Sequence, residues 1–146
     1  MRVRPAALII QNDSLLTMRY RYGATDVYML PGGNPDPGEN LREALQRELH
    51  EELGIEAVAG QLVLCGEVLG WRGKEDTLHC VFEVTDSTGP ARLNPDHTSA
   101  VAVAWLPVAE LGTKVLYPQV GEALAEYLRG GLASVHIGTI EQPYVD

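Results

Sequence analysis

Cysteine is scarce in this 146-residue sequence, which contains only Cys65 and Cys80. Their spacing matches no metal-ligand motif. Both fall in segments that we predict to be strands, so we expect buried, reduced thiols. Adjacent positions in a hairpin would also allow a disulfide, but a cytosolic setting argues against one. A chain of this length can bury a substantial core without such staples, and we expect a single domain.

Positive charge is scarce as well. Eleven Lys and Arg residues stand against twenty Asp and Glu residues, which gives a formal net charge of -9. Non-specific binding to nucleic acid depends on neutralising phosphates, so this charge argues against a nucleic-acid partner. A small phosphorylated ligand remains compatible with it if a metal ion bridges the ligand to the protein.

Long apolar runs are missing too. No stretch approaches the roughly 18 apolar residues of a membrane-spanning helix, and the segment Met1 to Pro5 contains no signal-peptide core. We therefore expect a cytoplasmic protein without a membrane partner.

One stretch, residues 33–55, carries most of the functional information. It follows a Pro-Gly-Gly sequence and begins with turn-forming Pro, Asn and Gly residues, so the chain enters through a loop. Asn40 suits a helix N-cap, Glu43 has the capping-box spacing, and Gly54 suits the left-handed position that ends a helix. These signals predict a helix over residues 41–53.

This predicted helix combines an apolar face with clustered carboxylates. Leucines recur along one face at helical spacing, at Leu41, Leu45, Leu49 and Leu53. Glu48, Glu51 and Glu52 project within one turn beside that face, where like charges repel unless a cation or protons neutralise them. Mg²⁺ prefers such carboxylate oxygens and takes water and substrate phosphates as further ligands. A solvated acidic helix face is the alternative interpretation.

The same stretch resembles the signature of the Nudix hydrolases, Gly-x5-Glu-x7-Arg-Glu-U-x-Glu-Glu-x-Gly-U, in which U is apolar. Every defined position of the signature is filled, by Gly33, Glu39, Arg47, Glu48, Leu49, Glu51, Glu52, Gly54 and Ile55. The sequence is similar to MutT-like members of that family. Outside residues 33–55 the resemblance extends only to the order of elements.

The resemblance implies a metal-dependent hydrolase with a small nucleotide as its partner. Such an enzyme cleaves the diphosphate linkage of a nucleoside diphosphate joined to another moiety. Mg²⁺, with Mn²⁺ as the alternative, would be held by Glu48, Glu51, Glu52 and the backbone of Gly33.

Two further residues of the signature have implied functions in catalysis. Arg47 would orient the carboxylates, although a surface ion pair is the alternative. Glu39 would bind a second ion or favour the helix dipole. The number of metal ions stays open.

The general base also stays open. Glu52 and Glu48 compete with an acid outside the signature. Asp96 and His97 lie in a loop before a predicted strand, where some relatives supply a further acid, and His97 would titrate near neutral pH. Weaker candidates are Glu83 and Glu75.

Substrate identity is the least determined property. Arg19 and Tyr22 lie in a segment of mixed charged and aromatic residues, and with Trp71 they are candidates for phosphate contact or base stacking. The added signatures of the coenzyme A, ADP-ribose and diadenosine polyphosphate subgroups are not matched. The remaining candidate substrates are a nucleoside triphosphate and a nucleotide sugar.

The resemblance implies an α+β fold, the Nudix α/β/α sandwich with a mixed β-sheet. Residues 1–131 would form the Nudix hydrolase domain and residues 132–146 a C-terminal extended arm of it. Within the arm, Val135 to Ile140 is rich in β-branched residues, and we expect it to dock as a strand in its own subunit or across a homodimer. Predicted strands cover residues 6–10 and 15–20 as a hairpin, 27–30, one or two within 57–69, 77–85 and 100–106, and a second helix runs from about 117 or 118 to 128.

Two alternatives to a hydrolase follow from the same fold. A catalytically silent Nudix-fold nucleotide-binding or regulatory protein would carry a damaged signature or an added DNA-binding domain. An isomerase of isoprenoid diphosphates would need further catalytic residues and a longer chain. The intact signature favours the hydrolase.

Overall fold

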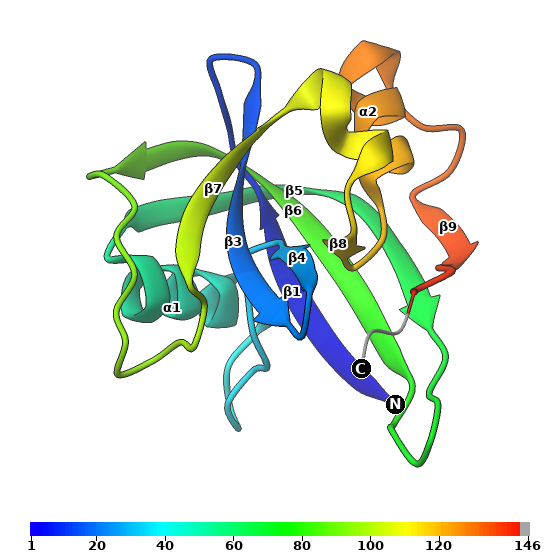
Figure 1. Cartoon of the computed structure of the whole chain (residues 1–146), viewed down its shortest axis with the longest axis horizontal. Coiled ribbons are helices and arrows are strands. Elements are labelled where there is room, and N and C mark those ends of the chain that lie inside the picture. Colours follow the sequence, from blue (N-terminus) through cyan, green and yellow to red (C-terminus); the bar gives the residue numbers. More distant parts are fainter. Residues whose placement is uncertain (144–146) are drawn as a thin grey trace.

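Two mixed β-sheets form the centre of the protein in the computed structural model, which describes residues 1–143 (Figure 1). The first sheet has the order β1 (Arg2–Leu8), β6 (Thr77–Thr88), β5 (Glu56–Val68) and β9 (His136–Thr139). The second has the order β2 (Ile10–Gln11), β3 (Ser14–Tyr22), β4 (Thr25–Met29) and β8 (Leu116–Tyr117), and β7 (Ala102–Pro107) pairs with β3. The predicted α+β class with mixed pairing is confirmed.

Helices α1 (Leu41–Leu53) and α2 (Gly121–Gly130) lie on opposite sides of these strands, and a 3-10 helix, η1 (Val108–Thr113), precedes β8 (Figure 1). Each helix packs into its own core cluster. Leu45, Leu49 and Leu53 of α1 are buried against residues such as Ile9 and Met18. Leu124 of α2 is buried in a cluster with Leu8, Leu64, Val81 and Leu116.

Helix α1 has the predicted boundaries because its ends are fixed by local interactions. The Asn40 side chain accepts a hydrogen bond from the backbone N–H of Glu43 at 2.9 Å, and the Glu43 carboxylate accepts one from the backbone N–H of Asn40 at 3.3 Å. Gly54 ends the helix with φ of 67°. This conformation favours glycine, as the sequence predicted.

The predicted hairpin at the N-terminus is wrong over most of its length. Only Ile10–Gln11 pairs with the start of β3, whereas β1 pairs in parallel with β6 in the other sheet. Ala6 and Ala7 are both fully buried. A strand that is buried on both faces suits a parallel pairing between packed layers, and its apolar run does not reveal the partner.

Helix α2 begins later than predicted. Leu116–Tyr117 forms β8 and pairs in parallel with Tyr28–Met29, so the helix starts only at Gly121 and continues to Gly130. Residues 57–69 form one long strand rather than two, with shifts of register near its middle.

The C-terminal segment docks as a strand within its own chain. Strand β9 pairs in parallel with β5, and the backbone N–H of Ile140 donates to the carbonyl oxygen of Glu67 at 2.7 Å. The predicted docking of this segment is therefore confirmed for one subunit, while a homodimer stays a prediction. Residues 144–146 of the predicted arm lie outside the described residues.

Cys65 and Cys80 are opposite each other in the β5–β6 pairing, and both are free thiols. Burial raises the pKa of Cys80 to about 11, which keeps its thiol protonated near neutral pH. The prediction of free thiols is confirmed for both residues, whereas the predicted burial holds for Cys80 only, because Cys65 is half-buried. Neither helix of residues 1–143 is long and apolar enough to cross a membrane.

Candidate active site

Arg47 lies within ion-pair distance of four carboxylates, those of Asp36, Glu39, Glu48 and Glu51. Its guanidinium donates to both oxygens of Glu39, with N···O distances of 2.7 and 2.9 Å. Its Nη1 also donates to Glu48 at 3.0 Å and to Glu51 at 3.2 Å. Such charge-assisted bonds are stronger than neutral ones, and they hold the pKa of Glu39 below its usual range. We call Glu39, Glu48, Glu51 and Glu52 the acidic cluster.

Glu52 is the buried member of the acidic cluster, with 8% of its surface exposed. Burial raises the pKa of Glu52 to about 8, and a hydrogen bond with Glu48 and the negative charge of Glu48 add to this effect. The positive charge of Arg4 acts in the opposite direction. Glu48 and Glu52 therefore form a pair in which full ionisation is unfavourable without a cation nearby.

Gly33 lies against this pair. A side chain at Gly33 would collide with the carboxylate of Glu48, so only glycine allows the loop to approach so closely. The backbone N–H of Gly33 donates to the carbonyl oxygen of Pro5 at 3.3 Å, which ties the loop to β1. The structure thus brings Gly33 and the carboxylates of α1 together, as the sequence predicted.

Arg4 is a buried residue near the site that the sequence analysis missed. Its Nη2 donates to the carbonyl oxygen of Leu30 at 2.9 Å, and Nη1 has no hydrogen-bond partner within residues 1–143. Its guanidinium carbon lies 5.6 Å from the centre of the Tyr117 ring. The available signal was an arginine directly before the apolar run of β1, since such residues are rarely buried unless they are paired.

The loop between β6 and β7 also contacts the acidic cluster. The backbone N–H of Asn94 donates to the carbonyl oxygen of Glu52 at 2.9 Å, and His97 Nδ1 lies 3.8 Å from a carboxylate oxygen of Glu51. Asp96 is exposed and bonds through its backbone N–H to Asn94. The structure therefore brings His97 to the acidic cluster, whereas the Asp96 side chain makes no hydrogen bond or ion pair with the cluster in the described part of the chain.

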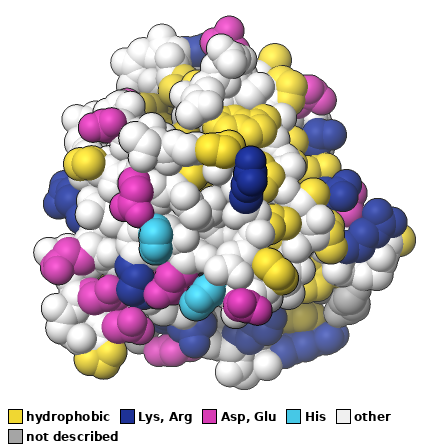
Figure 2. Space-filling view, turned by 90° about the vertical axis from the view of Figure 1, so that its left-hand side faces the viewer, with side chains coloured by type: hydrophobic (Ala, Val, Ile, Leu, Met, Phe, Trp, Pro, Cys, Tyr) yellow, Lys and Arg dark blue, Asp and Glu magenta, His cyan; other side chains and the backbone are white. Residues whose placement is uncertain are grey.

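Glu83, a weaker candidate, lies elsewhere and accepts a hydrogen bond from the hydroxyl of Tyr127 at 3.0 Å. Glu75 forms an ion pair with the N-terminal amine at 3.5 Å. Figure 2 shows Asp and Glu side chains gathered on the face that carries α1, with basic and histidine side chains among them.

The predicted substrate contacts were Arg19, Tyr22 and Trp71, together with Asp96 and His97 described above, and of these Tyr22 lines a cavity. This cavity, of about 270 Å³, is lined by residues of both sheets, including Tyr22 and Tyr117. Arg19 instead lies 3.9 Å from Asp26 in an ion pair. Trp71 belongs to the turn between β5 and β6, where the guanidinium of Arg72 lies 3.9 Å from its ring. Within residues 1–143, the lining of this cavity includes Tyr22 but neither Arg19 nor Trp71.

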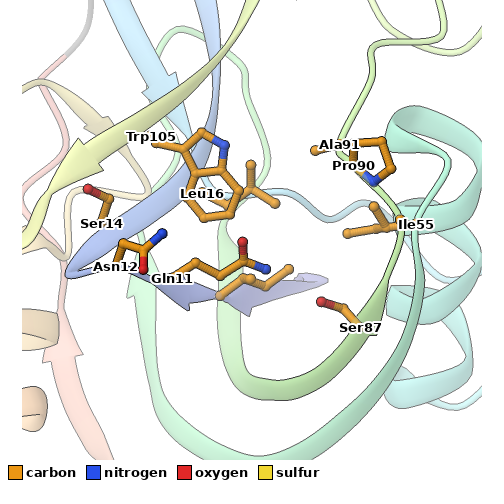
Figure 3. A pocket seen from close by; sticks show the side chains of 11 residues that line it. Gln11, Asn12, Ser14, Leu16, Ile55, Ser87, Pro90, Ala91 and Trp105 are labelled. Atoms are coloured by element: carbon orange, nitrogen blue, oxygen red, sulfur yellow. The ribbon is translucent and has the colours of Figure 1, made fainter.

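A second cavity, of about 410 Å³, lies at the opposite end of β3 and is lined by uncharged residues. Figure 3 shows Trp105 on one side of it and Ile55 on the other. The acidic cluster contributes no lining residue to this cavity. The cavity with Tyr22 and Tyr117 is the better candidate for a substrate site, because Arg4 lies near the ring of Tyr117 and its positive charge acts on Glu52.

The donors at the site fit a hard divalent cation, although no three His, Cys, Asp or Glu side chains of residues 1–143 are already arranged as a metal-binding group. The Arg47 guanidinium contacts both Glu48 and Glu51. Carboxylate oxygens are the ligands that Mg²⁺ prefers. Within residues 1–143 no ion pair neutralises Glu52, and the close approach of Gly33 places backbone beside Glu48.

The signature, the fold and this cluster define a Nudix protein. The chain matches the model of the NUDIX domain over residues 1–128 and therefore belongs to the Nudix hydrolase family, as the resemblance implied. Among curated proteins, it is 39% identical over 64 residues to the CTP pyrophosphohydrolase of Escherichia coli K12, which covers 42% of this chain and 47% of that protein. It is 34% identical over 64 residues to the RNA pyrophosphohydrolase of Legionella pneumophila, which covers 44% of this chain and 35% of that protein.

The matched region thus spans less than half the length of these curated relatives. Solved structures resemble the chain more completely. The Escherichia coli ORF135 protein has a TM-score of 0.76 and 25% identity, and the match covers 92% of this chain and 95% of that one. The MutT Nudix hydrolase of Burkholderia pseudomallei has a TM-score of 0.64 and 27% identity, and the match covers 74% and 84% of the two chains.

Proposed function

We propose that this protein is a metal-dependent hydrolase of small nucleotides that cleaves the diphosphate linkage of a nucleoside triphosphate or a nucleotide sugar. The observation that carries the proposal is the pairing of the buried Glu52 with the partly buried Glu48 beside Arg47, within a complete Nudix signature. The name of the Escherichia coli relative, CTP pyrophosphohydrolase, supports a nucleoside triphosphate.

In this proposal Glu48, Glu51, Glu52 and the backbone of Gly33 hold Mg²⁺, with Mn²⁺ as the alternative. When bound, the cation neutralises phosphate charge and acidifies a coordinated water. The repulsion between Glu48 and Glu52 supplies a physical reason for the site to favour a cation. The glycine at position 33 lets the loop lie close to Glu48, so that its backbone can help to hold the cation.

The residues of the chain then have separate functions. Arg47 keeps the carboxylates of Glu48 and Glu51 in fixed positions through its Nη1. Glu39, held by Arg47, accepts a hydrogen bond from the backbone N–H of Asp36 at 2.7 Å and so closes the loop before α1. Glu52 is our candidate general base, with Glu48 as the alternative.

In the reaction, the oxygen of a water molecule bonds to one phosphorus while the bridging P–O bond breaks, so two phosphorylated products and one proton are released. A carboxylate that is partly protected from solvent can accept that proton on its oxygen. His97 Nδ1 lies 3.8 Å from a carboxylate oxygen of Glu51. Its contribution to the reaction stays a prediction.

The test is a panel of nucleoside triphosphates, nucleotide sugars and dinucleotides, assayed for phosphorylated products with Mg²⁺, with Mn²⁺ and with a chelator. We expect metal-dependent cleavage of at least one nucleoside triphosphate or nucleotide sugar. Cleavage that persists in the chelator contradicts the proposal. If nucleotides bind but none is cleaved, the result favours the alternative function, a catalytically silent nucleotide-binding protein.

We also propose a cytoplasmic location, which the two free thiols support, because such thiols persist in reducing compartments. Separation of cell fractions followed by immunoblotting tests this location. A homodimer remains a proposal that light scattering on the purified protein tests.

A further inference from the structure

The segment that follows α2 forms part of a cavity wall. The match to the NUDIX domain ends at residue 128, but Gln142 and Pro143 line the cavity of about 270 Å³ together with Tyr22 and Tyr117. Strand β9 fixes this segment to the first sheet through β5. Part of the cavity wall is therefore built from residues that lie beyond the matched domain.

The amide of Gln142 is held in one orientation. Its Oε1 accepts a hydrogen bond from the backbone N–H of Gln119 at 2.8 Å, and its Nε2 donates to the carbonyl oxygen of Leu116 at 2.9 Å. These two partners distinguish the oxygen from the nitrogen. A primary amide has two N–H donors and an oxygen that accepts twice, so one donor and one acceptor remain available.

The cavity around Gln142 suits a flat, partly polar ring. Two tyrosines supply aromatic surface for stacking, and Val27, Met29 and Val68 supply apolar contact. Its volume of about 270 Å³ lies near the lower end of the range for ligand pockets, which fits a base rather than a whole nucleotide.

Two buried polar side chains, Arg4 and His79, pack near the ring of Tyr117, which forms part of the cavity wall. Tyr117 lines the cavity, and the guanidinium of Arg4 lies 5.6 Å from the centre of its ring. His79 packs edge-on against the same ring, with ring centres 5.1 Å apart. His79 is fully buried, and neither of its ring nitrogens has a hydrogen-bond partner within residues 1–143. Neither of these two buried residues is among the described residues that line the cavity, whose own polar lining comes from side chains such as Lys74, Glu75 and Gln142, and this lining suits a partly polar ligand.

We propose that Gln142 is a specificity-determining residue that recognises the nucleobase of a nucleotide bound in this cavity. Its remaining N–H and carbonyl lone pair match adjacent donor and acceptor groups on a base edge, the pairing that side-chain amides make with bases. The inference rests on the proposed function, because a nucleotide is the substrate proposed above. The base lies against Gln142, Tyr22 and Tyr117, and the phosphates extend toward Arg4 and the acidic cluster.

The test measures binding rather than turnover, so that it can fail independently of the proposed hydrolysis. Four ribonucleoside monophosphates and ribose 5-phosphate are titrated into the whole protein with a chelator present, and Kd is measured by calorimetry or NMR. We expect at least one monophosphate to bind more tightly than ribose 5-phosphate. In Gln142→Ala the affinity for that monophosphate falls about 5- to 20-fold, as expected for lost hydrogen bonds, and the affinity for ribose 5-phosphate is unchanged.

Gln119→Ala is the matched control. The Gln119 side chain also supports the β8 segment, since its Oε1 accepts from the backbone N–H of Leu116 at 2.8 Å, but Gln119 does not line the cavity. It should retain the preference for the base. The inference is overturned if no monophosphate binds more tightly than ribose 5-phosphate, if Gln142→Ala binds like the parent, or if Gln119→Ala weakens binding equally. Hydrolysis in the panel above can still succeed in each of these cases.

Discussion

Arg47 and Glu39 form a two-point contact across the loop that precedes α1, with N···O distances of 2.7 and 2.9 Å. The same guanidinium reaches Glu48 and Glu51, so one side chain joins the loop to two carboxylates of the helix. This geometry depends on the planar fork of arginine, which lysine lacks.

Replacement of Arg47 by lysine tests that dependence. In Arg47→Lys the charge is kept, but a single ammonium cannot contact Glu39 and Glu48 in the same way, so we expect kcat to fall by about 10- to 100-fold with little change in melting temperature. Steady-state kinetics on the best substrate of the panel measures the effect. Arg42→Lys, on an exposed part of the same helix, is the control and should keep parental kcat.

The variant Glu52→Gln tests whether the Glu52 carboxylate has a catalytic function or only a structural one. The change keeps the shape but removes a buried acid that is costly to ionise, so the metal-free protein should melt at the same or a higher temperature. The increase in melting temperature caused by added Mg²⁺ or Mn²⁺ should shrink, and activity should fall at least about 100-fold.

We expect Glu48→Gln and Glu51→Gln to behave in the same direction. Glu126→Gln, on the exposed face of α2, is the control for loss of a single negative charge. Near-parental turnover and undiminished metal stabilisation in all three cluster variants would be incompatible with the proposed metal site.

Gly33→Ala tests the close approach of the loop to Glu48. The new methyl group would collide with the Glu48 carboxylate, so we expect lower activity and weaker stabilisation by metal, while the circular dichroism spectrum stays that of a folded protein. Gly130→Ala is the control, because nothing lies within 4 Å of the position that its side chain would occupy. Its activity and folding should match those of the parent.

The burial of His79 lets us predict how the stability of the fold depends on pH. Burial lowers the pKa of His79 to about 3, whereas an unfolded chain binds a proton at histidine near pH 6.5. Between these values the unfolded chain holds the additional proton, so stability is lost as the pH falls from about 6.5 toward 3, by at most about 1.4 kcal/mol per pH unit.

In His79→Phe this part of the acid dependence should disappear, because the aromatic ring no longer titrates. Chemical denaturation at a series of pH values between 7 and 4 measures the slope. His50→Asn is the control, since His50 is exposed and lies 2.7 Å from the carboxylate of Glu56. A slope in His79→Phe equal to that of the parent would contradict the argument.

The features that the sequence predicted best are those fixed by nearby residues. The capping box of Asn40 and Glu43 and the left-handed Gly54 decide the ends of α1 within one turn of the chain. The carboxylates of Glu48, Glu51 and Glu52 then follow from helical spacing alone. The positions of these three carboxylates on the helix could therefore be inferred before any tertiary contact was known.

The features that the sequence did not predict depend on distant segments. Strand β1 pairs with β6, more than 70 residues away in the chain, and only this pairing places Arg4 opposite His79. Gln142 bonds to backbone atoms of residues 116 and 119, which no local pattern indicates. The acidic helix was predictable, while the cavity beside it requires the tertiary structure.

The last strand and the amide that follows it add a connection between the two sheets. Ile140 is hydrogen-bonded to Glu67 of the first sheet, and Gln142 is hydrogen-bonded to Leu116 of the second. Release of the C-terminus and widening of the cavity are therefore one opening event. The backbone amides of Ile140 and Gln119 should consequently exchange with solvent deuterium at the same opening free energy.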